Sequence, residues 1–296
     1  MQLTVTNLSK RYANGVQALN AVNLTVPTGM FGLLGPNGAG KSTLMRTMAT
    51  LQKADSGSIF LGDLNILERP DEVRKLLGYL PQEFGVYPQI TAQDLLTHFA
   101  TLKGVGPSSH RTAVVDALLR KVNLHHARHQ RLGSFSGGMK QRFGIAQALL
   151  GDPKLIIVDE PTAGLDPEER VRFHNLLSEI GEQIVVILST HIVEDVSDLC
   201  PNMAIIDKGK VVAQGKPQEL TDALIGQVWR REVGREELPA FQKSHRLLST
   251  RLRTGKTIVH VWSESQPDAT FERVEPDLED VYFRAIRGFA TPAAAA

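Results

Sequence analysis

Residues 32–43 read GLLGPNGAGKST, and this stretch decides the fold. It matches the pattern G-x-x-x-x-G-K-[ST] from Gly35 to Ser42. The apolar run MFGLLG at 30–35 predicts a buried strand, and the residues that follow the loop predict a helix. A glycine-rich loop between a strand and a helix is the context in which this pattern binds phosphate.

The residue types of the loop suit that chemistry. Glycines let backbone N–H groups turn toward phosphate oxygens, and the start of the helix adds partial positive charge. Lys41 supplies a cation for the outer phosphates, and the Ser42 hydroxyl suits Mg²⁺. The agreement of spacing and context disfavours a glycine turn without a ligand. We therefore expect the whole loop to bind the phosphates: Gly35, Pro36, Asn37, Gly38, Ala39, Gly40, Lys41, Ser42 and Thr43.

Strand and helix patterns alternate on either side of this loop. KLIIVDEP (154–161) and QIVVILSTH (183–191) are continuous aliphatic runs, typical of parallel strands covered on both faces. Between them, PEERVRFHNLLSEIGE (167–182) predicts an amphipathic helix. This βαβ pattern predicts an α/β fold with a parallel sheet. Further patterns predict a strand and its exit at 75–82, helices at 91–104 and 111–124, and a hairpin at 204–220 with Gly209 in its turn.

An acidic pair ends one of the aliphatic strands. Asp159 is placed to hold Mg²⁺ through its water shell, and Glu160 is placed to orient or deprotonate an attacking water. Ligands of α/β sheets bind at such strand ends. The alternative is an acidic pair that only starts a helix.

Composition excludes several classes of protein. The 296 residues carry a net charge of +1, so no overall field favours nucleic acid. Cys200 is the only cysteine, so no disulfide within the chain is possible. The N-terminus lacks the apolar stretch of a signal peptide, and the longest aliphatic runs fall far short of the roughly 20 residues of a membrane span. We expect that the chain does not itself cross a membrane.

These motifs, together with others in a fixed order, resemble those of the ATP-binding subunits of ABC transporters. Tyr12 in KRYANGVQAL matches the aromatic residue that stacks on adenine. Gln82 in YLPQEFGVYP matches the Q-loop glutamine, and FSGGMKQR (135–142) matches the signature loop. AGLD, which ends at Asp166, matches the D-loop, and His191 in LSTH matches the switch histidine. The resemblance covers roughly the first 220 residues.

The resemblance implies roles for these residues. Glu160, His191 and Gln82 would be catalytic, while Ser42, Gln82 and Asp159 would hold Mg²⁺. Ser136, Gly137 and Gly138 would bind the γ-phosphate of ATP held by the partner subunit, so that two ATP molecules lie between two subunits arranged head to tail. Two residues depart from the usual signature: Phe135 replaces a leucine and Met139 a glutamine, which is expected to weaken contacts on the adenosine side.

The resemblance also implies an architecture. It predicts a P-loop NTPase fold of the ABC ATPase type, with a RecA-like parallel sheet, an antiparallel β part and a helical subdomain at about 83–150. The ATPase domain would span 1–221, and 222–296 would form a small α+β accessory domain. Both tryptophans, Trp229 and Trp262, lie in this tail, which could therefore build a core of its own.

Partners and cargo direction follow from the same resemblance. The partners would be an integral membrane permease and a second ATPase subunit, and a homodimer of the ATPase is favoured. The cofactors would be ATP and Mg²⁺. The protein would be peripheral, at the cytoplasmic face of the inner cell membrane. Phe84 and Tyr87 would supply apolar contacts to the permease, with ordinary core packing as the alternative. The tail PDLEDVYFRAI (276–286) resembles exporter ATPases, which favours export over uptake.

Two other classes of P-loop protein are alternatives. A soluble ABC ATPase of translation or DNA repair would usually have tandem cassettes or a coiled-coil insertion, and the sequence has neither. A P-loop kinase or GTPase would not explain Ser136, Gly137 and Gly138, and the Asn-Lys-x-Asp motif of GTPases is absent.

Overall fold

A six-stranded sheet forms the centre of the molecule in the computed structural model, which describes residues 1–82, 85, 87–162, 164–181 and 183–289. Neighbouring strands of this sheet are parallel, except that β9 and β10 at one edge of the sheet are antiparallel. The predicted parallel sheet is thus confirmed. In spatial order the strands are β10 (Lys210–Gly215), β9 (Asn202–Asp207), β3 (Gly29–Leu34), β8 (Val185–Thr190), β7 (Leu155–Asp159) and β6 (Leu77–Leu80).

The central strands are buried along their whole length. Every residue of β7 and β8 is buried, which explains their unbroken aliphatic sequences. The hairpin between β9 and β10 turns at Lys208 and Gly209, both with positive φ, as predicted.

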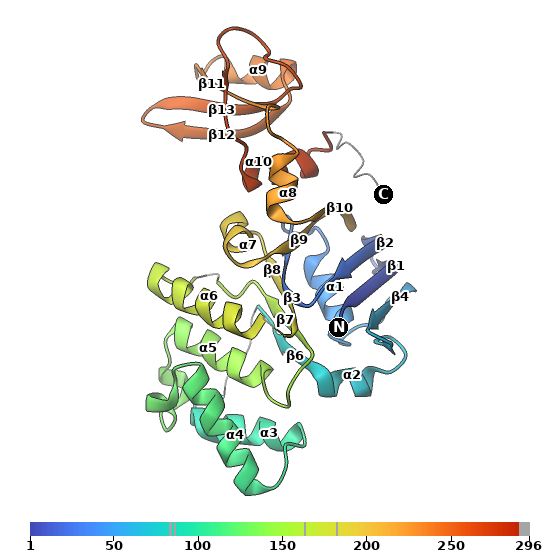
Figure 1. Ribbon diagram of the computed structural model, residues 1–296, viewed down its shortest axis with the longest axis vertical. Helices are drawn as coiled ribbons and strands as arrows, with labels where there is room; N and C mark the ends of the chain where they lie inside the picture. The colour runs from blue at the N-terminus through green and yellow to red at the C-terminus, as the bar shows by residue number, and fades with distance from the viewer. Residues whose placement is uncertain (83–84, 86, 163, 182, 290–296) are drawn as a thin grey trace.

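A second, antiparallel sheet lies beside the first, with α1 (Lys41–Met48) between them (Figure 1). Leu44, Met45 and Met48 of α1 pack in one apolar cluster with residues of both sheets. This packing holds the start of α1 at the end of β3. The second sheet has the order β2 (Gln17–Val26), β1 (Leu3–Arg11), β4 (Ser56–Leu61) and β5 (Leu64–Asn65).

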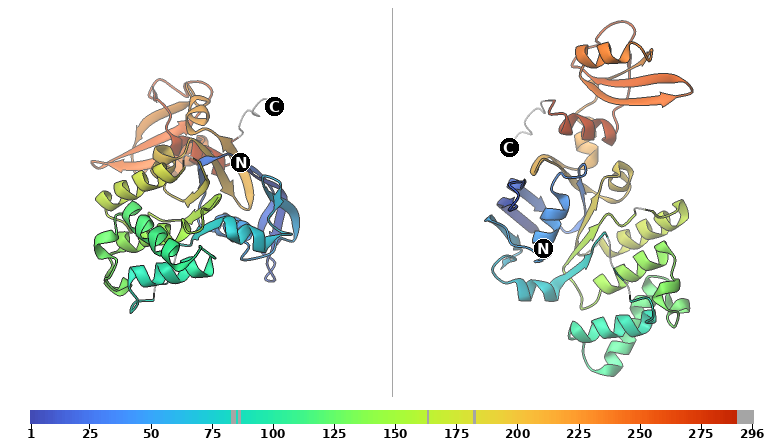
Figure 2. Two further views of the ribbon diagram at one scale, coloured as in Figure 1. Left: turned by 60° about the horizontal axis from the view of Figure 1, so that its bottom comes forward. Right: turned by 180° about the vertical axis from the view of Figure 1, so that it is seen from behind.

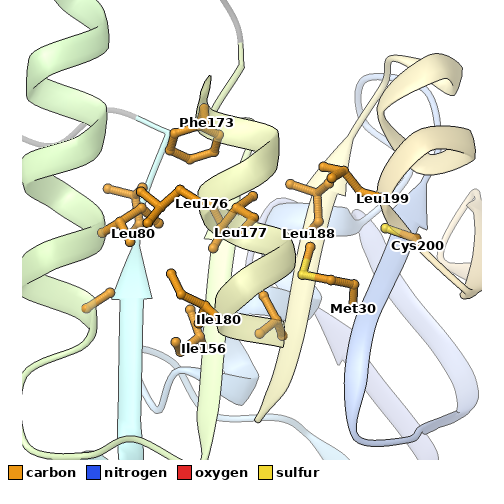
Figure 3. Packing of buried hydrophobic residues seen from close by; sticks show 14 of the residues in the cluster. Met30, Leu80, Ile156, Phe173, Leu176, Leu177, Ile180, Leu188, Leu199 and Cys200 are labelled. Atoms are coloured by element: carbon orange, nitrogen blue, oxygen red, sulfur yellow. The ribbon is translucent and has the colours of Figure 1, made fainter. Parts of the chain in front are cut away.

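Helices cover the opposite face of the central sheet. Figure 3 shows Phe173, Leu176 and Ile180 of α6 (Pro167–Gly181) facing the strands that carry Leu80 and Ile156. α5 (Gly137–Ala148) and α7 (Val193–Leu199) flank α6 on this face. The predicted amphipathic helix is therefore confirmed, with its apolar side on the sheet.

The predicted strand at 75–82 begins later than the sequence pattern indicated. Lys75 and Leu76 end α2 (Pro70–Leu76), and β6 starts at Leu77. A proline at the first position, acidic residues in the first turn and basic residues in the last turn favour the helix.

The helices predicted at 91–104 and 111–124 are present as α3 (Ala92–Leu102) and α4 (Ser108–Lys121). Thr91 caps α3 by accepting a hydrogen bond from Asp94 N. Together with α5 these helices form the end of the molecule drawn in green (Figure 1). Two single turns connect them, η1 (His125–Ala127) and η2 (Leu132–Ser134). Phe84 lies outside the described residues, whereas Tyr87 is exposed.

The tail folds into an antiparallel sheet at the opposite end of the molecule from α3 and α4 (Figures 1 and 2). Trp229 belongs to a separate apolar cluster formed by this sheet and α9 (Leu238–Ser244). The sheet of the tail has the order β12 (Leu247–Arg253), β13 (Lys256–Trp262), β11 (Val228–Val233) and β14 (Glu272–Arg273), and α8 (Pro217–Asp222) precedes it.

Not all of the tail's apolar residues join that separate cluster. Trp262 packs instead in the cluster that covers the central sheet, together with Val281 and Tyr282 of α10 (Leu278–Ile286). Because α10 also contacts α7 and α8, it joins the tail to the ATPase-like part. The boundary at 222 stays a prediction, since apolar packing is continuous across it.

Candidate functional site

The predicted phosphate loop connects the end of β3 to the start of α1. Gly38 and Gly40 have φ of 80° and 107°, a region that favours glycine. A side chain at Gly35 would collide with the Ile206 carbonyl, and one at Gly40 with the Ala18 carbonyl. Among the described residues no side chain caps the N-terminus of α1, so the first backbone N–H groups of this helix can bind an anion.

Lys41 is folded back over the loop. Its Nζ donates hydrogen bonds to Gly35 O (2.6 Å) and Pro36 O (3.3 Å) and lies 3.7 Å from Glu160 Oε1. Burial lowers the pKa of Lys41, while the carboxylates of Glu160 and Asp159 oppose this change. The loop therefore surrounds a buried cation that can bind phosphate oxygens.

Asp159 ends β7 beside the loop. Burial raises the pKa of its carboxyl, against the opposing effects of the Lys41 ammonium and the Ser42 hydroxyl. Asp159 Oδ1 is buried and has no hydrogen-bond partner among the described residues. A carboxylate oxygen without a partner, next to a serine hydroxyl, fits a hard divalent cation such as Mg²⁺.

Glu160 is the point at which several predicted residues meet. Its Oε2 accepts a hydrogen bond from Gln82 Nε2 (3.1 Å) and lies 3.3 Å from His191 Nδ1. Gln82 follows β6, Glu160 follows β7 and His191 follows β8, so all three lie at the carboxyl ends of parallel strands in one sheet. This edge is where α/β sheets bind ligands.

The backbone at Glu160 is unusual for a residue with a side chain. Its φ is 46°, in the left-handed region, and its N–H donates to Ser189 O at 2.9 Å. Such conformations persist only where the surrounding structure holds them, and they concentrate at functional sites. The Glu160 side chain is 12% exposed, so it is shielded but still accessible to water.

Tyr12 lies at the rim of the loop. Its hydroxyl is 3.1 Å from Thr43 Oγ1 and donates to Gln52 Oε1 at 3.2 Å. The side chain is partly exposed beside the start of α1, which leaves its ring available for stacking.

The signature residues lie apart from this group. Ser136 caps α5, with its Oγ accepting a hydrogen bond from Met139 N at 3.2 Å, so the signature residues lie at the start of a helix. Ser136 and Gly137 are exposed, whereas Gly138 packs against the Glu169 side chain. Within the part of the chain that the structure describes, no hydrogen bond or ion pair joins these three residues to the phosphate loop.

Sequence reasoning missed one component of this region. Asp195 on α7 is completely buried and bonds to residues near Glu160 and His191. A carboxylate within a short helix that follows a buried strand was the available signal, but only the fold shows what it contacts.

Comparison with known proteins assigns the family. Residues 19–163 match the ABC transporter domain family. The ABC transporter ATP-binding protein YxlF of Bacillus subtilis is 32% identical over 96% of this chain and 99% of its own length. The chain belongs to the ATP-binding subunits of ABC transporters. Because members of this family bind and hydrolyse ATP, the chain is an ATPase.

Other ABC relatives differ in the direction of transport that their names give. The Nod factor export ATP-binding protein I of Burkholderia orbicola is 30% identical, over 94% of each chain. The methionine import ATP-binding protein MetN 1 of Burkholderia pseudomallei is 36% identical, over 86% of this chain and 76% of its own length.

A solved structure supports the ABC ATPase fold. The ATP-binding subunit of an ABC transporter superposes with a TM-score of 0.67 at 29% identity, covering 75% of this chain and 92% of the other. Among the described residues, no helix combines the length and the apolar character needed to cross a membrane.

Proposed function

We propose that this ATPase powers the export of a substrate across a membrane through a separate permease subunit. The observation that supports the ATPase chemistry is the meeting of Lys41, Gln82 and His191 at the Glu160 carboxylate. Two candidate catalytic residues and a phosphate-binding cation thus lie around the proposed base.

The residues of the site divide the chemistry among them. Bound Mg²⁺ would neutralise charge on the β- and γ-phosphates, and Ser42, Asp159 and the free oxygen of Gln82 would hold it. Lys41 binds the outer phosphates, and Tyr12 stacks on the adenine.

Glu160 is the proposed general base. A water attacks the γ-phosphorus and transfers a proton to Glu160, while the bond to the bridging oxygen breaks and releases ADP and phosphate. His191, 3.3 Å from Glu160 Oε2, and Gln82, 3.1 Å from it, hold the carboxylate in place.

A second subunit would complete the γ-phosphate site. Ser136 and Gly137 are exposed at the start of α5, with Gly138 buried next to them, and within the described residues no hydrogen bond or ion pair joins the three to the loop of their own chain. Backbone N–H groups at a helix start suit γ-phosphate oxygens, so we propose that they close over ATP in the partner. With two identical chains, the head-to-tail dimer has two such sites.

An apolar groove supports a membrane partner. It lies between the end of α1 and α3 and is lined by Leu51, Tyr79, Phe99 and Leu102 among others. Leu51 is 57% and Leu102 70% exposed, which is unusual for leucines on one surface. We propose that a cytoplasmic segment of the permease packs here and holds the ATPase at the cytoplasmic face of the membrane.

Two observations favour export. The tail motif at 276–286 forms α10, which joins the C-terminal sheet to the ATPase core. The relative named for export aligns over 94% of each chain, whereas the one named for import aligns over 86% of this chain and 76% of its own length.

Transport direction can be measured in inside-out membrane vesicles that contain the chain and the permease that co-purifies with it. ATP added outside is expected to drive fluorescent drugs or labelled oligosaccharides from a test panel into the lumen, and Glu160→Gln serves as the inactive control. ATP-driven release of methionine loaded into the vesicles would instead indicate import and contradict the proposal.

A further inference from the structure

Asp195 lies on α7, one turn beyond His191, and is 0% exposed. A buried carboxylate is costly unless charged and hydrogen-bonding groups surround it. The Asp195 carboxylate makes five polar contacts, with side chains from three parts of the chain.

Two of these contacts reach the proposed catalytic loops. Asp195 Oδ2 accepts hydrogen bonds from Thr162 Oγ1 (2.6 Å) and Thr190 Oγ1 (3.3 Å). Thr162 comes two residues after Glu160, and Thr190 comes directly before His191. One carboxylate oxygen therefore joins the two segments whose side chains lie 3.3 Å apart at Glu160 and His191.

The remaining contacts come from α6. Asp195 Oδ1 accepts a hydrogen bond from Arg170 Nε (2.8 Å), and Arg170 Nη2 and His174 Nε2 lie at 2.6 and 3.0 Å. α6 begins directly after the D-loop residue Asp166. The same side chain thus links the ends of β7 and β8 to the helix that follows the D-loop.

The strained backbone of Glu160 makes this link more than packing. Glu160 has a φ of 46°, which its intrinsic backbone preference disfavours, so the surrounding structure must hold its backbone in this conformation. The hydrogen bond from Thr162 restrains the chain immediately after Glu160, and that from Thr190 restrains the chain immediately before His191. A shift of about 1 Å between the two would disturb a geometry on which the rate depends strongly.

We propose that Asp195 is a positioning residue for ATP hydrolysis, which sets the separation of Glu160 and His191 through Thr162 and Thr190. The proposal rests on the proposed roles of Glu160 and His191. It does not involve the phosphate loop, so it predicts a loss of turnover without a loss of nucleotide affinity.

Matched substitutions at Thr162 separate this role from packing. Thr162→Val keeps the shape and removes the hydroxyl, whereas Thr162→Ser keeps the hydroxyl and removes a methyl group. We expect Thr162→Val to lower kcat about tenfold, the size of one lost hydrogen bond to a charged group, and Thr162→Ser to retain most of it. Fluorescent nucleotide titration should give the same Kd for both variants as for the wild type.

Two further variants complete the experiment. Thr190→Val should lower kcat as Thr162→Val does, and the double variant should lose more kcat than either single variant. Thr257→Val, the same change at a buried threonine of β13 in the C-terminal sheet, controls for the loss of a buried hydroxyl. Melting temperatures are recorded for every variant.

The outcomes distinguish the two proposals. A wild-type kcat in Thr162→Val and Thr190→Val would overturn the role of Asp195, as would a greater loss in Thr162→Ser than in Thr162→Val. Glu160→Gln is assayed alongside: if it hydrolyses ATP at the wild-type rate, the proposed base is wrong. If Glu160→Gln is inactive while both valine variants are normal, only the positioning role fails.

Discussion

Glu160→Gln is the substitution that tests the site most directly. Glutamine has the same shape, and its side-chain oxygen can still accept the hydrogen bond from Gln82 Nε2, 3.1 Å away, and lie 3.3 Å from His191 Nδ1. What it loses is the ability to accept a proton from water. The change therefore removes the proposed chemistry while retaining the packing.

The magnitude follows from the contacts. A positioned general base contributes roughly 10²–10⁴ in rate, so we expect kcat to fall by about that factor, or roughly 3–5 kcal/mol in activation free energy. Nucleotide affinity should be no weaker. Lys41 keeps its carbonyl contacts, and it loses a carboxylate at 3.7 Å that competes with phosphate for its charge.

The assay measures phosphate release at saturating ATP, with the permease present or at a concentration that allows dimers. The expected variant binds ATP and accumulates as a dimer on size-exclusion chromatography with ATP. Glu168→Gln is the matched control, because its carboxylate is 75% exposed on α6 and contacts only Arg172 among the described residues. Turnover of Glu160→Gln within tenfold of the wild type would refute the assignment.

Three further predictions test other parts of the molecule. Lys41→Ala and Ser136→Arg are each expected to be inactive as homodimers. Mixed dimers of the two should recover part of the ATPase activity, because one site then has an intact phosphate loop and an intact signature. Confirmed mixed dimers without activity would count against a signature that acts in the partner, unless both sites must work together. Burial raises the pKa of Asp159, so the folded chain prefers the protonated carboxyl and loses stability as the pH rises from the usual carboxyl pKa toward the raised one. Asp159→Asn should therefore raise the melting temperature at pH 7 without nucleotide, and it should abolish Mg²⁺-dependent turnover. A lower melting temperature would contradict this prediction. A chain ending at Pro276 lacks α10 and should melt at a lower temperature yet still bind fluorescent ATP, whereas an unchanged melting temperature would show that α10 adds little to the core.

Local sequence determined the elements that carry the site. The glycines of the phosphate loop are required by local φ angles and by close backbone approaches, which is why Gly35 to Ser42 could be read without a structure. The aliphatic runs of β7 and β8 predict buried parallel strands, because such strands have no face exposed to water. The order of the motifs was enough to indicate the ABC family.

Only the tertiary structure decided which side chains meet. Gln82 and Glu160 are 78 residues apart, and their hydrogen bond exists because β6 and β7 are neighbours in the sheet. Trp262 joined the central cluster rather than that of Trp229 because α10 packs between the tail and α7. The sequence pattern could not distinguish these cases, because burial depends on what covers a residue.

Asp195 illustrates the same limit most clearly. Its five polar contacts come from the segments that follow or end β7 and β8 and from α6. None of these contacts comes from α7, the helix that carries Asp195. An acidic residue in a short helix ordinarily faces solvent, and its sequence neighbours give no sign that this one is buried. A carboxylate becomes a structural centre only when the fold brings its partners to it, and that arrangement depends on strand order and helix packing rather than on local pattern.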